Sequence, residues 1–381
     1  MSLTITDSEN NTASNSLNVS LESNPNTFER ILGPDYVRLS SENQIVRIGQ
    51  FVYFASGEGI NNLMGVAIRL KKFDLTGNLI WTVTLLEDQN ASWGNPIMQG
   101  TSDSGLIVIA NDLIFKLNTE GTVLWSKERD GEIKFVELGD GNYFFIRTLT
   151  EGSASRAYYS IVSPSGQVLE EGLIDPGYVV SRISDIEEGP EANTFVTMAS
   201  VVIPDFPDIK TEIQLINTSG EVLQSYRSTY PFASSQNSTE LSRNANGSYS
   251  AYYTPSEQNE RKIRRVTVDA SLNFENEIVY DFAKSHEVFE VIPANGGGHY
   301  IIGSFGTSLW TSKSLFFKID TNGQLIWQRE YGDISSIMDF CTGLLELPNG
   351  NIMISGSTLV GPVGAGIVKA YLNRYNSNGE L

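Results

Sequence analysis

The segment FKIDTNGQLIW, residues 317–327, decides the fold of this chain. An apolar strand ends in Asp320, two polar residues lead to Gly323, and an apolar pair then precedes Trp327. The Asp side chain caps the backbone of the turn, and Gly adopts the positive φ that a bulkier residue resists. The segment therefore predicts a tight β-hairpin.

The same phrase recurs along the chain, and seven copies are present in all. The other six copies are FDLTGNLIW (73–81), FKLNTEGTVLW (115–125), IVSPSGQVLE (161–170), QLINTSGEVLQ (214–224), VTVDASLNFEN (266–276) and LNRYNSNGEL (372–381). Their turn positions are Gly77, Gly121, Gly166, Gly220, Leu272, Gly323 and Gly379, at intervals of 44, 45, 54, 52, 51 and 56 residues. Such a period is typical of a four-stranded β-propeller blade.

A second glycine-containing turn precedes the first one in most repeats and is followed by an apolar or alternating strand. These earlier glycines are Gly105, Gly141, Gly247, Gly297 and Gly350. Each repeat thus reads as strand A, turn, strand B, loop, strand C, Asx-Gly turn and strand D, without helical periodicity. The sequence predicts an all-β protein, a seven-bladed β-propeller of four-stranded antiparallel blades.

Two departures within the repeats carry expectations about packing. Leu272 stands where the other turns have Gly, so we expect that turn to have another shape. A Trp four residues after the turn glycine predicts a ring wedged between neighbouring blades. The three Trp residues are Trp81, Trp125 and Trp327. Where Glu170, Gln224 and Asn276 take that place, we expect looser packing of the outer strands.

The two ends of the chain are expected to meet in one blade. The seventh copy ends at Leu381, before its strand D can form. The stretch NTFERILGPDY (26–36) resembles the strand D ending IWQREYGDIS (326–335). We therefore expect residues 26–32 to form the outer strand of the last blade, closing the ring and covering its sheet edges. Residues 1–25 are predicted to be a flexible polar leader, and 26–381 a single propeller domain.

The pattern D-x-x-G-x-x-x-W, present from Asp74 to Trp81 and from Asp320 to Trp327, resembles the repeats of quinoprotein-like (PQQ-like repeat) bacterial β-propellers of the secreted or lipoprotein type. The resemblance implies an exported propeller. In the redox members of that group a quinone cofactor is bound, commonly with calcium and often beside a vicinal disulfide. A chain whose only cysteine is Cys341 cannot form that disulfide, so we expect no quinone cofactor.

Composition excludes several classes of function. With 26 Lys and Arg against 45 Asp and Glu, the net charge of −19 repels nucleic acid. One cysteine and two histidines do not support zinc or haem chemistry, and Cys341 is expected to be a small buried hydrophobe. The sequence has no apolar run of about 18 residues, so no transmembrane helix is predicted. We expect a monomer outside the cytoplasm, secreted, periplasmic or lipid-anchored, whose polar leader follows a removed export signal.

Function in propellers lies on loops around the central channel, here the D-to-A links and the B-to-C loops. Aromatic side chains there can stack on sugars, peptides or planar ligands. The candidate ligand-binding residues are Trp93, Tyr178, Phe206, Tyr230 and Trp310. Asp205 and Asp208 flank Phe206 on a proline-stiffened loop and are candidate calcium ligands; no other cofactor is expected.

Two classes of function remain open. The first is a non-enzymatic extracytoplasmic binding or interaction module for a protein, peptide or glycan. The alternative is a carbohydrate-active or degenerate quinoprotein-type enzyme with its site at the channel mouth. The pairs Glu170-Glu171 and Glu187-Glu188 are candidate carboxylates for glycoside cleavage, and His286, rather than His299, is a candidate general base. Acids converging on the channel would favour the enzyme, and an aromatic-lined face the binding module.

Overall fold

The structure is a computed structural model of the whole chain. It describes residues 2–6, 12–16, 28–32, 37–38, 44–60, 65–88, 96–110, 113–128, 131–151, 154–202, 209–231, 239–255, 262–282, 286–305, 313–331, 339–360 and 367–380. None of the residues in these ranges is helical.

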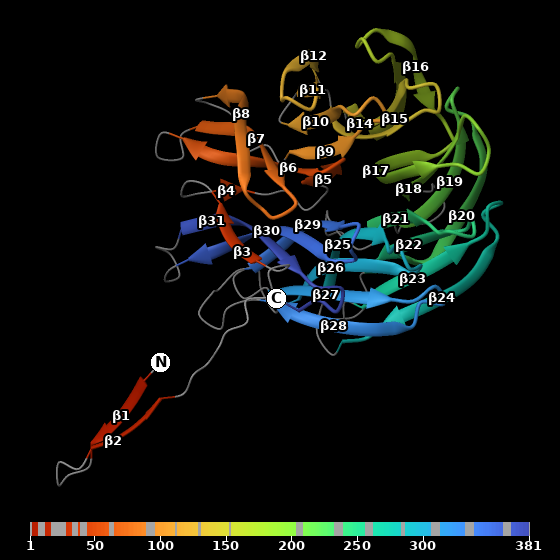
Figure 1. Cartoon of the computed structure of the whole chain (residues 1–381). Helices are drawn as coiled ribbons and strands as arrows, with labels where there is room; N and C mark the ends of the chain where they lie inside the picture. Colours follow the sequence, from red (N-terminus) through yellow and green to blue (C-terminus); the bar gives the residue numbers. More distant parts are fainter. Residues whose placement is uncertain are drawn as a thin grey trace.

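Seven antiparallel sheets stand around a common axis as a seven-bladed β-propeller, with strand A of each blade nearest the centre (Figure 1). The A strands are β5 (Ile45–Ile48), β9 (Ile97–Gly100), β13 (Glu132–Glu137), β17 (Val179–Glu188), β21 (Thr239–Arg243), β25 (His286–Pro293) and β29 (Asp339–Glu346). The B strands are β6 (Phe51–Ile60), β10 (Leu106–Ala110), β14 (Tyr143–Glu151), β18 (Thr194–Val202), β22 (Tyr249–Tyr253), β26 (His299–Phe305) and β30 (Ile352–Val360).

The C strands follow outward, and the D strands form the rim. The C strands are β7 (Gly65–Asp74), β11 (Leu113–Leu117), β15 (Ala154–Val162), β19 (Lys210–Asn217), β23 (Ile263–Val268), β27 (Lys313–Ile319) and β31 (Ile367–Tyr375). The first six D strands are β8 (Leu79–Asp88), β12 (Val123–Glu128), β16 (Val168–Ile174), β20 (Val222–Pro231), β24 (Phe274–Tyr280) and β28 (Leu325–Tyr331).

The D strand of blade 7 comes from the beginning of the chain. β3 (Phe28–Leu32) pairs antiparallel with β31, from Phe28 opposite Arg374 to Leu32 opposite Ala370. The ring is therefore closed by hydrogen bonds between its two ends, and the predicted closing strand is confirmed within residues 26–32.

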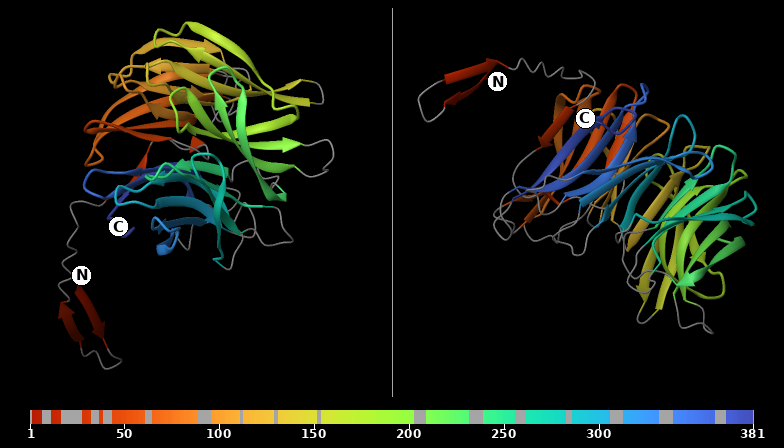
Figure 2. Two further views of the ribbon diagram at one scale, coloured as in Figure 1. Left: turned by 90° about the vertical axis from the view of Figure 1, so that its right-hand side faces the viewer. Right: turned by 90° about the horizontal axis from the view of Figure 1, so that it is seen from below.

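Blade 1 has a divided inner edge. β4 (Val37–Arg38) pairs with Gly57 and Glu58 of β6, and β5 pairs with residues 51–54 of the same strand. Ahead of the ring, β1 (Ser2–Thr6) and β2 (Thr12–Ser16) form a hairpin that lies apart from the blades in Figure 1 and in both views of Figure 2. The division into a leader and a propeller domain stays a prediction.

All seven C–D hairpins have the same turn, including the one that lacks Gly. In each turn the N–H of the fourth residue donates to the C=O of the first at 2.8–3.1 Å. Leu272 takes a φ of 56°, so the expectation of a different turn was wrong. Its side chain is 2% exposed and packs with Tyr249 and Val268. Burying a Leu contributes about 1.5–3 kcal/mol, which offsets the roughly 1–2 kcal/mol cost of the left-handed backbone.

The tryptophan wedges are confirmed. A Cβ added to the turn glycine of the following blade would lie 2.9 Å from Trp81, 2.8 Å from Trp125 and 2.9 Å from Trp327. Since real Cβ atoms do not approach so closely, each of these glycines is required by the neighbouring ring as well as by its own φ.

In the blades without Trp, tyrosines make the contacts to the next blade, and the expectation of looser packing stays a prediction. In blade 3, Tyr159 would lie 2.7 Å from a Cβ on Gly220. In blade 4, Tyr226 stacks on Phe274 of blade 5 at 5.9 Å. In blade 5, the Tyr280 hydroxyl donates to the Gly323 carbonyl at 3.0 Å. Tyrosines from strands C and D thus replace the Trp ring.

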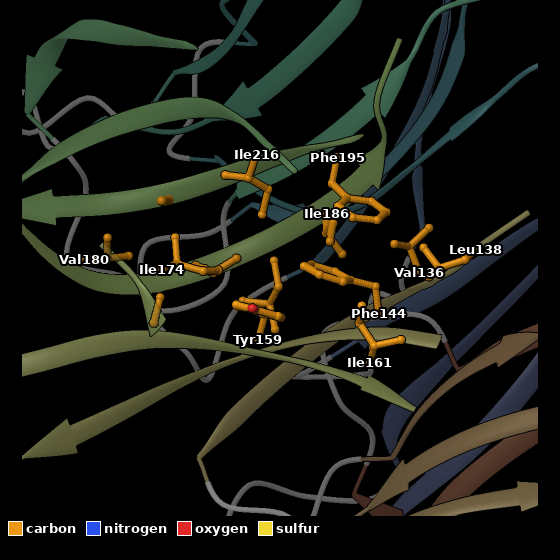
Figure 3. Close-up of a cluster of buried hydrophobic side chains, with 14 of the residues drawn as sticks. Val136, Leu138, Phe144, Tyr159, Ile161, Ile174, Val180, Ile186, Phe195 and Ile216 are labelled. Atoms are coloured by element: carbon orange, nitrogen blue, oxygen red, sulfur yellow. The ribbon is translucent and has the colours of Figure 1, made fainter. Parts of the chain in front are cut away.

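The hydrophobic core is divided into layers between adjacent blades. Figure 3 shows the layer between blades 3 and 4, where Phe144 of β14 stacks on Phe195 of β18 with ring centroids 4.2 Å apart. Ile161 and Ile186 border the same pair of rings (Figure 3). These layers pack the blades face to face around the axis, and the A strands therefore surround it.

Candidate ligand-binding channel

A cavity of about 730 Å³ lies on the axis of the ring, and each of the seven A strands contributes to its wall. It reaches the A–B turns, since Gly49, Ser104 and Asn295 also line it. A volume of this size lies within the roughly 300–1,000 Å³ of small-molecule pockets. The channel is therefore large enough for a ligand of several tens of atoms.

Hydrogen bonds between blades fix the position of this wall. Both carboxylate oxygens of Asp185 on β17 accept backbone N–H groups, from Ile186 at 2.8 Å and from Leu241 of blade 5 at 2.7 Å. Asp185 is half-buried and lines the cavity. Its carboxylate thus joins two A strands at the edge that faces the channel.

Carboxylates at the ends of two A strands bind the preceding blade in a similar way. Glu137 accepts the N–H of Ser102 at 2.6 Å and its hydroxyl at 2.7 Å. Glu346 accepts the N–H of Asn295 at 2.6 Å. Both donors belong to an A–B turn, where backbone N–H groups need such acceptors. These acids are explained by the assembly of the ring.

Arg47 and Gln99 have no such role. Both residues line the cavity, on the neighbouring strands β5 and β9. Arg47 is half-buried and Gln99 is exposed. Within the part of the chain that the structure describes, neither side chain makes a hydrogen bond or an ion pair. Their donor groups are accessible to a ligand in the channel.

Glu187 is an acid of the wall with a strongly perturbed pKa. Burial raises its pKa to about 8, and the neighbouring charges of Asp185 and Glu188 act in the same direction. The backbone and side chain of Arg243 oppose this shift. Glu187 is therefore largely protonated near neutral pH, and it can donate a hydrogen bond or a proton into the cavity.

Among the predicted ligand-binding residues, the structure describes the side chain of Tyr178 alone. Its hydroxyl donates to the buried carboxylate of Glu212, and the Gln214 amide donates to the same hydroxyl at 3.3 Å. The Arg227 guanidinium lies 5.4 Å from the centre of the Tyr178 aromatic ring, and it forms an ion pair with Glu212 at 2.8 Å. Burial and Glu212 together raise the pKa of Tyr178 to about 12. Tyr178 thus takes part in a polar cluster of blade 4.

The remaining predicted residues cannot be placed beside the channel. Trp93, Phe206 and Trp310, with the candidate calcium ligands Asp205 and Asp208, lie outside the described residues. Tyr230 and His286 belong to β20 and β25, but their side chains lie outside the described part as well. Their proposed roles stay predictions.

Neither of the two candidate carboxylate pairs lies in the channel as a pair. Glu170 and Glu171 are exposed on β16 at the rim, where Glu170 accepts the Tyr159 hydroxyl at 2.9 Å. Glu188 contacts Arg243 at 3.6 Å and is not part of the cavity wall, whereas Glu187 is. Three other acids line the cavity with Glu187, namely Asp185 of the same strand, Glu290 and Glu346.

His299 and Cys341 are both buried. His299 is 2% exposed, with Nδ1 at 3.0 Å from the Tyr252 hydroxyl and Nε2 at 3.1 Å from the Ser242 hydroxyl. Burial, supported by the charge of Arg265, lowers the pKa of His299 to about 3. Cys341 is 1% exposed, which confirms the predicted small buried hydrophobe. Its Sγ lies 3.1 Å from the Tyr371 hydroxyl.

Within the described ranges, no three His, Cys, Asp or Glu side chains gather as a metal site would require. The same ranges contain no helix long and apolar enough to cross a membrane.

The cavity wall is formed by the inner strands and not by the loops that were predicted to carry function. A signal for them existed, namely single charged or amide residues inside short apolar A strands. Examples are IVRI in β5, IMQG in β9 and EIKFVE in β13. Such residues have no distinguishing local pattern, but an innermost strand of a propeller borders the channel.

No protein-family model matches the sequence, and no curated protein matches it. Several solved structures are similar in fold. The acylaminoacyl peptidase of Pyrococcus horikoshii has a TM-score of 0.54 at 9% identity, covering 91% of this chain and 53% of that one. The polysaccharide lyase Uly1 has a TM-score of 0.53 at 10% identity, covering 89% and 91%.

The β-propeller domain of the Trilobed protease from Pyrococcus furiosus, which has an open velcro topology, gives a TM-score of 0.52 at 9% identity, covering 89% and 95%. At such identities the similarity concerns the fold alone. The comparisons therefore agree with the β-propeller that the seven sheets form.

Proposed function

We propose that the protein is a non-enzymatic binding module that takes a ligand into the central cavity of its propeller. The observation that carries the proposal is the cavity of about 730 Å³, in which Arg47 and Gln99 present polar groups without a partner among the described residues. Rigid inner strands hold these groups in place, so binding requires little reorganisation. We also propose that the protein works outside the cytoplasm, on the basis of its polar leader.

Gln99→Trp tests the location of the site. Gln99 is exposed and lines the cavity, so an indole there fills the channel without entering the core. Gln328→Trp is the matched control, since Gln328 is exposed on the rim strand β28. A library of small molecules, peptides and glycans is screened by thermal shift. Ligands of the wild type should bind Q328W equally and Q99W at least about tenfold more weakly. Ligands that bind Q99W as well as the wild type would exclude the channel.

The loop aromatics are tested in the same assay. Trp93→Ala and Trp310→Ala should weaken ligands that extend from the channel onto the predicted loop face. Ligands that are sensitive to Q99W and insensitive to both replacements would restrict the site to the channel.

A second candidate function rests on Glu187. A carboxyl with a pKa near 8 beside a second acid of the same cavity, Asp185, suits general acid catalysis, in which Glu187 would protonate the leaving oxygen of a glycoside. The similarity in fold to the polysaccharide lyase Uly1 gives the substrate class to try first. The second candidate function is thus that of a carbohydrate-active enzyme.

Reducing-end release from a panel of polysaccharides between pH 5 and 9 tests this reading. Glu187→Gln should abolish release, and Glu188→Gln, next to it but outside the cavity wall, should not. Absence of release across the panel and the pH range would count against the enzyme.

A further inference from the structure

The charges that line the cavity are divided between two halves of the ring. The basic residues are Arg47 of blade 1 and Lys134 of blade 3, and the acids are Asp185 and Glu187 of blade 4, Glu290 of blade 6 and Glu346 of blade 7. Blade 2, between the two basic residues, adds Gln99. One half of the wall is therefore positive or neutral, and the other half carries all of these acids.

Burial makes this separation effective. Lys134 is 8% exposed and Glu290 is 3% exposed, so their charges act through the protein wall rather than through bulk water. At short range, Coulomb interactions in such an environment are several times stronger than in water. Both residues also interact within the protein, so they shape the field in the cavity rather than serve as the contact groups.

The contact groups differ between the two halves. The Arg47 guanidinium and the Gln99 amide present donors that suit a carboxylate. Across the cavity, Asp185 and Glu187 present carboxyl oxygens, and an ammonium group bound beside Glu187 would favour its ionised, accepting form. Ile292 and Leu345 are half-buried and supply an apolar section of the wall on blades 6 and 7.

We propose that the cavity binds a small zwitterion of the peptide class, with its carboxylate toward Arg47 and Gln99 and its ammonium group toward Asp185 and Glu187. This inference rests on the proposed function and names the ligand class of that same site. A short peptide with free ends separates its charges by up to about 3.3–3.6 Å per residue, which suits two opposite walls better than a single amino acid. Its apolar side chains would contact Ile292 and Leu345.

Three matched probes test the charge requirement by calorimetry on the full chain. Leucyl-leucine carries both charges, N-acetyl-leucyl-leucine only the carboxylate, and leucyl-leucine amide only the ammonium group. The free dipeptide should bind at least about tenfold more tightly than either blocked form, because each blocked form loses one charge-assisted contact. Equal binding of the free dipeptide and either blocked form would overturn the proposal.

Two variants assign the ends of the ligand. Arg47→Gln should weaken binding of the free dipeptide about tenfold or more and leave binding of the amide unchanged. Glu187→Gln should weaken binding of the free dipeptide by a similar factor and leave binding of the N-acetyl form unchanged. Arg329→Gln on the rim and Glu188→Gln beside the cavity are the controls, and thermal melting checks that all four variants fold. Loss of affinity for all three probes in one variant would contradict the assigned orientation.

Failure of this proposal can be told apart from failure of the proposed function. If the library yields ligands that Q99W excludes, and none is a zwitterion, the channel binds ligands and the zwitterion proposal is wrong. If Q99W excludes no ligand, the binding channel itself is wrong.

Discussion

His299→Gln is expected to flatten the acid side of the protein's stability profile. His299 is 2% exposed and bonded through both ring nitrogens, to Tyr252 and Ser242. Its pKa in the fold is lowered to about 3, chiefly by burial, whereas a histidine in the unfolded chain titrates near 6.5. Below pH 6.5, His299 is therefore protonated in the unfolded chain and still neutral in the folded protein.

The sign and size of the effect follow from these two values. The stabilisation is fully present above pH 6.5 and falls by about 1.4 kcal/mol per pH unit toward the folded pKa. Between pH 7.5 and 4.5 the loss is about 2–3 kcal/mol. Glu187 acts with the opposite sign, because its raised pKa favours the fold below about pH 4.5 and loses that effect as the pH rises to about 8. The substitution leaves Glu187 in place, so the difference between the two proteins isolates His299.

Urea unfolding of the wild type, His299→Gln and the control His286→Gln at pH 7.5, 6 and 4.5 measures the effect. H299Q is expected to be less stable at pH 7.5, where it loses imidazole packing, and to lose about 2–3 kcal/mol less on acidification. H286Q should follow the wild-type profile. Parallel profiles of H299Q and the wild type would refute the reasoning, since His299 would then titrate alike in the folded and unfolded chains.

Three further outcomes are expected. Gly166→Ala should lower the melting temperature more than Gly247→Ala, because both glycines have φ near 85° but a Cβ at Gly166 lies 2.8 Å from Trp125 and one at Gly247 meets nothing within 4 Å; equal melting would exclude the wedge. Leu272→Ala should be less stable than Leu272→Gly by about 1 kcal/mol in chemical denaturation, since both variants lose the buried side chain but the positive φ of this position strains Ala and not Gly. Removal of residues 1–24 should leave the melting temperature nearly unchanged and removal of 1–33 should lower it strongly, because the longer truncation deletes β3; similar melting of both would contradict closure of the ring.

The blade architecture could be predicted because its signals are local and repeated. An Asx residue followed three positions later by Gly fixes one hairpin regardless of the rest of the chain, and the structure has that turn in all seven blades. The missing strand D of the last repeat was visible as a gap, and β3 fills it. The positive φ of Leu272 was missed because it depends on burial in a layer between blades. In the A–B turn of blade 2, Ser104 rather than Gly105 takes the positive φ, with a value of 63°.

The candidate site was harder to predict because it is built from residues that no local pattern relates. Arg47 and Glu187 stand in different blades, and their facing the same cavity follows from ring closure alone. The prediction concentrated on aromatic loops, since aromatic residues outside strands are conspicuous in sequence. Strand A positions appear as ordinary strand residues, and their place at the axis becomes visible once seven sheets are assembled.

The inner strands also show which polar residues the ring does not need. Two residues before the A–B turn, blades 3, 6 and 7 carry Val136, Ile292 and Leu345, so an apolar side chain is compatible with that position. Blades 2 and 4 carry Gln99 and Glu187 at the same place, in the wall of the cavity. A half-buried acid whose pKa is raised by burial costs stability, and an apolar residue there would avoid that cost. Asp185, Glu137 and Glu346 offset their burial through hydrogen bonds between blades, and Glu187 accepts one from the backbone of Arg243 in blade 5. Among the described residues, Gln99 has no comparable contact with the rest of the ring. A polar group kept at a position where an apolar one suffices, and where the ring does not use it, is best explained by what enters the channel, and this is why the variant at Gln99 separates function from stability.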